Sequence, residues 1–174
     1  MFATENTQCR PNWRKMALRF ATIVAVLLSG PAFAATVTTN FTVQITIQAT
    51  CVILSASTLD FGTQGVLTAN VDQVSTIAVQ CTNTTPYNIG LNAGISAGAT
   101  VTTRKMTNGA ATVSYALFSD AGRTTNWGQT IGTDTVVGTG TGASQPFTVF
   151  GRVAPQTTPA PNTYTDTITV TVTF

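Results

Sequence analysis

The sequence contains no histidine and few charged residues. Only 8% of its 174 residues are Asp, Glu, Lys or Arg. Without histidine the chain cannot form a Ser-His-Asp triad, a Cys-His pair or a zinc site with a histidine ligand. Hydrophobic residues make up 43% of the chain, which is enough for a core and excludes the intrinsically disordered class. The length allows one domain, or one domain plus a processing segment.

The N-terminal segment has the organisation of a secretory signal peptide. Arg10, Arg14, Lys15 and Arg19 precede an apolar run over residues 20–30, and Pro31-Ala32-Phe33-Ala34 follows. A basic region, a short apolar region and an A-x-A site define such a signal, and the run is shorter than the roughly 20 residues that span a bilayer. We therefore predict a signal peptide over residues 1–34, cleaved after Ala34. Met16 is an alternative start that leaves the product unchanged, and an N-terminal membrane anchor is the alternative interpretation.

Cleavage removes half of the basic residues. Residues 35–174 contain four basic residues and five aspartates, a net charge of −1. So few cations cannot neutralise a nucleic-acid backbone, and we expect no nucleic-acid partner. The adjacent Arg104 and Lys105 precede a turn, and we expect both at a solvated edge.

Nothing in the sequence favours a catalytic or metal site. The aspartates Asp60, Asp72, Asp120, Asp134 and Asp166 are far apart in the chain. There is no D-x-[DN]-x-[DN]-G calcium loop, and no spacing favours a pair of catalytic carboxylates. We therefore expect no enzyme activity, no metal, no cofactor and no small-molecule substrate.

Two cysteines, Cys51 and Cys81, remain after cleavage. An even number of cysteines in an exported chain is typical of a disulfide bond. The bond would close a loop of about 31 residues and stabilise the fold by roughly 3–4 kcal/mol in the chain-entropy model. The alternative is a metal or redox pair, which the absence of a C-x-x-C motif and of histidine disfavours.

The exported part begins with an unusually long alternation of apolar and polar residues. Val37, Phe41, Val43, Ile45 and Ile47 share one face, on which Thr39 is the one weak member, while threonine, asparagine and glutamine occupy the other. A strand usually has five or six residues, and this alternation extends toward Ile53. It therefore predicts two functional strands in series.

The remaining chain reads as further short strands. They are predicted at residues 74–81, 87–91, 101–106, 113–117, 147–153 and 164–174. Asn108-Gly109 predicts a tight hairpin turn, prolines at 155, 159 and 161 mark a loop, and the Gly/Thr-rich residues 133–144 predict a flexible loop. Short strands separated by turn signals predict a β-sandwich.

A series of short motifs occurs along this chain in a specific order. They are Ala49-Thr50-Cys51-Val52-Ile53, Leu59-Asp60-Phe61-Gly62, Val79-Gln80-Cys81-Thr82, Arg104-Lys105-Met106, Tyr115-Ala116-Leu117-Phe118, Trp127-Gly128, the segment 147–153 and the ending 164–170. Their order and spacing resemble the spore coat protein U domain family over nearly all of the exported chain. Pro161-Asn162 departs from the Ala-Gly that the family tends to have there.

The resemblance implies a fold, partners and a location. The family includes subunits of archaic (Csu-type) chaperone–usher pili, which implies an all-β, incomplete immunoglobulin-like sandwich of about six strands that lacks its last strand. It also implies a Cys51–Cys81 bridge. The implied partners are neighbouring pilus subunits, a periplasmic chaperone and an outer-membrane usher. The implied route runs through the periplasm to the cell surface, with cell adhesion and biofilm formation as the setting.

The long alternation then has a role. We expect residues 35–44 to be a donor strand, with Val37, Phe41 and Val43 entering the groove of a neighbouring subunit, and residues 45–174 to be the domain itself. The groove-edge, chaperone-facing strand would carry Tyr164, Ile168, Val170, Val172 and Phe174, with the Phe174 carboxylate available to a chaperone.

These expectations define a function and its rivals. A structural subunit of the pilus shaft is favoured over a tip adhesin, because the 140 residues after the signal leave no room for a second binding domain. One alternative is a secreted spore or cell-surface coat protein with a self-contained sandwich. The other is a small carbohydrate-binding module, which would need an exposed face of aromatic residues.

Overall fold

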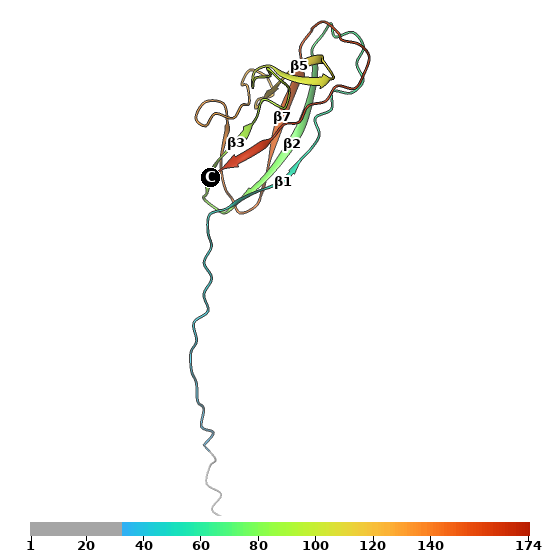
Figure 1. Ribbon diagram of the computed structural model, residues 1–174. Helices are drawn as coiled ribbons and strands as arrows, with labels where there is room; N and C mark the ends of the chain where they lie inside the picture. Colours follow the sequence, from blue (N-terminus) through green and yellow to red (C-terminus); the bar gives the residue numbers. More distant parts are fainter. Residues whose placement is uncertain (1–32) are drawn as a thin grey trace, which may run out of the picture. The chain divides into compact units, whose positions relative to one another are not determined.

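The computed structural model describes residues 33–174 and divides the chain into two units, one ending at Val43 and the other comprising Gln44–Phe174 (Figure 1). Residues 1–32, with nearly all of the predicted signal peptide, lie outside the described residues. From residue 33 to residue 50 the chain has no regular secondary structure. Over 33–174 we find no helix of the length and apolarity that crossing a membrane requires.

The second unit is an all-β sandwich. Its eight strands are β1 (Cys51–Ala56), β2 (Val71–Cys81), β3 (Pro86–Leu91), β4 (Arg104–Asn108), β5 (Ala111–Phe118), β6 (Val136–Thr139), β7 (Ser144–Val153) and β8 (Val170–Thr173). One sheet has the order β1-β2-β7-β5-β4 and the other the order β6-β3-β8. The strands β2, β7 and β5 lie side by side along the larger sheet (Figure 1). The predicted immunoglobulin-like fold is confirmed, with eight strands where about six were expected.

Alternation in the sequence identified the inward faces well. On β5 the alternate residues Val113, Tyr115 and Leu117 are all buried, as are Ile77 and Val79 on β2. The β4–β5 hairpin turns at Asn108-Gly109 as predicted, with the glycine at φ 59°. Such a left-handed conformation is one that glycine adopts without steric cost.

The segment 133–144 is more ordered than its composition suggested. It contains β6, which pairs antiparallel with β3 and places Gly138 opposite Tyr87. A Cβ atom at Gly138 would collide with the Tyr87 ring. The glycine therefore permits close packing against an aromatic side chain, which is a recognised reason for glycine in a strand, and the expected flexible loop is wrong for this part.

The first and last strands are shorter than predicted. The strand β1 begins at Cys51, whereas the domain's own first strand was expected from about Ile45. The last segment, predicted as one strand over 164–174, has only β8 in its ladder with β3, while Thr165 forms an isolated bridge with Thr107. Between them, Thr169 donates its backbone N–H to the Asn92 side chain instead of to a strand. In this segment a side-chain oxygen thus replaces a backbone carbonyl as the hydrogen-bond acceptor.

Cys51 and Cys81 form a disulfide bond, as expected. The two residues face each other in the register of β1 and β2, so the bond links the first residue of an edge strand to the last residue of its inner neighbour. Cys81 is buried in the core.

Arg104 is buried rather than solvated, contrary to expectation, and its side chain is 0% exposed. Its guanidinium donates hydrogen bonds to four backbone carbonyls, those of Asn92 at 2.8 Å, Val101 at 2.7 Å, Leu91 at 3.0 Å and Trp127 at 2.7 Å. Burial lowers the pKa of Arg104. A buried guanidinium needs such partners to offset its lost hydration, and here three loop segments and the end of β3 supply them.

Candidate functional site

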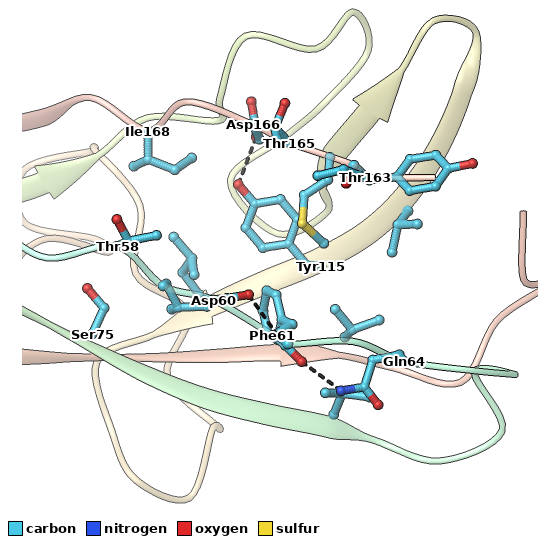
Figure 2. Close-up of a pocket in the computed structure, with 18 of the residues that line it drawn as sticks. Thr58, Asp60, Phe61, Gln64, Ser75, Tyr115, Thr163, Thr165, Asp166 and Ile168 are labelled. Carbon is cyan, nitrogen blue, oxygen red and sulfur yellow. Dashed lines mark hydrogen bonds between the residues drawn. The ribbon is translucent and has the colours of Figure 1, made fainter. Parts of the chain in front are cut away.

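A pocket opens into the hydrophobic core next to an edge strand of each sheet. β1 is an edge of the five-stranded sheet, and β8 is an edge of the three-stranded sheet. A pocket of about 750 Å³ opens into the interior, lined by residues 56–65 on one side and by residues 158–168 with Val170 on the other (Figure 2). We call this pocket the groove.

The floor of the groove is apolar. It consists of core side chains from β2, β5 and β7, namely Ile77, Val113, Tyr115, Leu117, Val149 and Val153. Phe61 packs edge-on against Tyr115, with ring centroids 6.1 Å apart. Leu59 lies over the bare backbone of Gly151, where an added Cβ would come within 2.7 Å of the Leu59 Cδ1 atom. The surface exposed in the groove is therefore the unfilled side of the hydrophobic core.

The predicted groove-edge residues lie beside this core. Tyr164, Ile168, Val170 and Val172 are half-buried and pack against it, whereas Phe174 is exposed. The odd positions of this segment, Thr165, Thr167, Thr169, Thr171 and Thr173, are exposed, whereas Asp166 is half-buried. The alternation of the last segment thus gives one inward row at the even positions.

The predicted donor residues Val37, Phe41 and Val43 have exposed fractions of 94%, 86% and 84%. They belong to the segment without regular secondary structure. Ile45 and Ile47, the next members of the same face, are exposed as well. Their assignment as a donor strand stays a prediction.

A polar pair spans the groove between its floor and its edge, and sequence reasoning did not find it. The Tyr115 hydroxyl donates a hydrogen bond of 2.7 Å to Oδ2 of Asp166 (Figure 2). The backbone N–H groups of Ile95 and Thr167 donate to Asp166 Oδ1 at 3.0 and 2.8 Å. Burial, followed by the contact with Asp166, raises the pKa of Tyr115, so this hydroxyl remains a donor at neutral pH. The available signal was the position of Asp166 in an otherwise apolar row.

Asp60 is the second aspartate of the groove, although nothing in the sequence indicated that two aspartates come together in one pocket. It is exposed, and its Oδ1 accepts a hydrogen bond of 2.8 Å from the Gly62 backbone N–H. Within residues 33–174 no group of three or more Cys, Asp or Glu residues could hold a metal ion. The carboxylates of Asp60 and Asp166 are held by donors of the chain itself, and the apolar lining suits the groove to an extended apolar segment.

The aromatic residues of the core do not form a sugar-binding face. Phe61, Tyr87, Tyr115 and Trp127 are all buried, and the Trp127 indole donates a hydrogen bond of 2.9 Å to the Ile89 carbonyl. Stacking on a sugar needs an exposed ring, so these side chains do not support the carbohydrate-binding alternative.

Known proteins are similar to this chain in fold and in sequence. A chain of the crystal structure of the CsuC–CsuE chaperone–tip adhesion subunit pre-assembly complex, from archaic chaperone–usher Csu pili of Acinetobacter baumannii, is 28% identical with a TM-score of 0.54. That likeness covers 74% of this chain, which spans 40% of the length of the other. Protein U of Myxococcus xanthus is 36% identical over 176 residues, covering 92% of this chain and 98% of Protein U. The Spore Coat Protein U domain matches residues 37–171, and the chain belongs to this family.

Proposed function

We propose that this chain is a structural subunit of a surface pilus, assembled by the chaperone–usher pathway through donor-strand complementation. The observation that carries the proposal is the groove, which opens to the core between the segment that follows β1 and the segment that precedes β8, next to an edge strand of each sheet. An open sheet edge next to exposed core is an aggregation hazard unless another strand covers it. Strand addition is the mode of binding that suits such an edge.

Residues 35–44 of a neighbouring copy have the properties of the missing strand. They alternate with period two, carry no charge and present Val37, Phe41 and Val43 on one face. If these three side chains bury fully at roughly 1.5–3 kcal/mol each, they contribute about 5–9 kcal/mol before ordering costs. Association itself costs about 4–15 kcal/mol, so the backbone hydrogen bonds of the added strand must contribute as well.

The geometry of such an exchange produces a fibre. Each subunit gives a strand to one neighbour and accepts a strand from another, so the contact is heterologous and does not close on itself. The low charge and threonine-rich surface suit a structural polymer of the shaft. Before assembly the groove would be filled by a periplasmic chaperone, and an outer-membrane usher would exchange chaperone for donor strand at the cell surface. The similarity to a chain of a chaperone–subunit complex supports this order of events.

Two aspartate substitutions on opposite faces of the donor segment test the proposal. Phe41→Asp places a charge in an apolar groove, which costs far more than losing the ring alone. Thr42→Asp adds the same charge on the opposite, polar face. We expect the Phe41→Asp chain to fold and bind its chaperone, because its own groove is intact, but to form no polymers. The Thr42→Asp chain should polymerise. Electron microscopy of surface fibres and sedimentation of the purified protein measure the difference.

A second outcome would favour a different function. The family description names the spore coat, and a coat protein with a self-contained sandwich is the main alternative. It predicts that Phe41→Asp assembles normally, or that residues 35–44 form a fixed strand in the core of their own monomer. Either result would contradict donor-strand exchange through this segment. A chain without residues 35–44 gives an independent check, since it should accept a strand but donate none.

A further inference from the structure

We propose that Thr39 of the donating chain lies over the Tyr115–Asp166 pair of the accepting chain, and that this polar contact fixes the register of the donor strand. The inference rests on the proposed function and adds to it a residue-level rule for how two copies align. It names one polar position in each partner, and both positions interrupt rows that are otherwise apolar.

The accepting row has a single charged member. The even positions of the last segment, from Tyr164 to Val172, are half-buried and line or adjoin the groove, and four of the five are apolar or aromatic. Asp166 is the fifth. Because Asp166 occupies an inward position of the segment that would flank the incoming strand, a donor side chain would lie next to it.

The donating row also has a single polar member. From Val37 to Ile47 every second residue is apolar except Thr39. A shift of the donor by one residue would turn its threonine face into the core, which the apolar lining of the groove disfavours. A shift by two residues would keep the apolar face inward but would set Val37 or Phe41 against Asp166. The apolar pattern alone therefore leaves two-residue shifts open, and the polar pair distinguishes among them.

The Asp166 carboxylate has room for one more donor. A carboxylate offers about four acceptor positions, and three are occupied: two on Oδ1 by the Ile95 and Thr167 N–H groups and one on Oδ2 by the Tyr115 hydroxyl. A threonine hydroxyl can donate to Oδ2, or to the Tyr115 oxygen, which can also accept. A valine in the same place would cover the charge without satisfying it, which costs more than an apolar contact returns.

Asp60 is the other charged residue of the groove and is a less suitable partner. It is exposed, its side chain caps the Gly62 backbone, and it lies on the 56–65 side, outside the inward row of the last segment. Hydration satisfies an exposed carboxylate without help from a donor strand. Asp60 thus provides a matched control for Asp166, being an aspartate of the same groove with different burial.

The experiment measures the affinity of labelled peptides of residues 35–47 for the exported chain. The acceptor carries Phe41→Asp so that it keeps its groove but does not donate, and binding is followed by fluorescence anisotropy. The peptides are wild type, Thr39→Val and Thr39→Ser. Valine has the shape of threonine without its hydroxyl, and serine keeps the hydroxyl. We expect Thr39→Val to bind at least about tenfold more weakly, and Thr39→Ser to stay within about threefold of wild type.

The same peptides on two acceptor variants locate the contact. With Asp166→Asn in the acceptor, the loss caused by Thr39→Val should shrink to less than about threefold, because no charge remains to be covered. With Asp60→Asn the tenfold loss should persist. If Asp166→Asn fails to fold, as judged by its unfolding midpoint, Asp166→Ala replaces it with the same expected result, because it also removes the charge.

The outcomes separate the register from the proposed function. A purely apolar groove predicts that Thr39→Val binds as tightly as wild type or more tightly, and either result overturns the register while leaving strand donation in place. A Thr39→Val loss that is the same on all acceptors also overturns it. Failure of the wild-type peptide to bind would overturn the proposed function together with the register.

Discussion

Replacing Arg104 with methionine should destabilise the domain severely. Methionine keeps an unbranched apolar side chain in the site but removes all hydrogen-bond donors from the four carbonyls that the guanidinium now serves. The two fully buried acceptors, the carbonyls of Leu91 and Trp127, cost about 1–3 kcal/mol each when left without a partner, or about 2–6 kcal/mol together, and the part-buried carbonyls of Asn92 and Val101 add to this. Part of this is offset, because the variant no longer buries a cation. We expect a net loss of at least about 3 kcal/mol, a large fraction of the 5–15 kcal/mol typical of a domain.

Trp127 provides the assay for this loss. It is the only tryptophan after residue 34, it is buried, and its own carbonyl accepts one of the Arg104 hydrogen bonds. Its fluorescence should therefore follow unfolding in urea. With a slope of about 1–3 kcal/mol per molar urea, a loss of 3 kcal/mol lowers the midpoint by about 1–3 M. Arg152→Met is the control, since it removes a guanidinium paired with Asp72 at the surface. Equal midpoints for the two variants would refute the argument that the buried carbonyls depend on Arg104.

Three further predictions concern the disulfide, pH and a glycine. Replacing Cys51 and its partner with serine should lower the free energy of unfolding by roughly 3–4 kcal/mol, and mass spectrometry of the unreduced exported protein should show the pair linked. Burial raises the pKa of Tyr115 above its ordinary 10.0. The unfolded state therefore loses the Tyr115 proton first, and the free energy of unfolding should fall as the pH rises above about 10. In urea midpoints measured from about pH 8 to 11, the Tyr115→Phe variant should show a weaker dependence on pH. Gly94→Ala should destabilise the domain more than Gly109→Ala. Both glycines have a positive φ, but of the two only Gly94 is so placed that an added Cβ would collide with the Asp166 carboxylate. Equal melting temperatures of the two variants would contradict this.

The sequence predicted what depends on local pattern and missed what depends on distant partners. Alternation identified the inward residues of β5 and the half-buried row of the last segment, because burial on one face of a strand imposes a period of two. The burial of Arg104 could not be read in this way, since its acceptors are backbone carbonyls up to 23 residues away in the chain. For the same reason, the Gly/Thr-rich residues 133–144 were predicted as a flexible loop, because the close packing of Gly138 against the Tyr87 ring is a contact between residues distant in the chain.

The candidate site shows the same division. The period of two predicted the alternating row of the last segment, and the resemblance implied its groove-edge role, which stays a prediction. The pairing of Cys51 with Cys81 was predicted from the number of cysteines in a chain expected to be exported. The Tyr115–Asp166 hydrogen bond joins residues 51 positions apart; the local pattern marks Asp166 as an exception in an apolar row but does not identify Tyr115 as its partner. Asp166 appeared only as one of five scattered aspartates, and its place in the inward row acquired meaning once Tyr115 was found opposite it.

The position of the disulfide bond has a mechanical consequence. Cys51 is the first residue of an edge strand, so tension on the segment before it would ordinarily peel β1 from the sheet one hydrogen bond at a time. The bond to Cys81 transfers that load to the end of β2 instead. β2 is held on its other side by β7 over ten residue pairs, so the load reaches an inner strand that has a partner on each side. A covalent link at this point therefore protects the edge strand, because β1 cannot leave the sheet from its first residue while its disulfide partner stays in place.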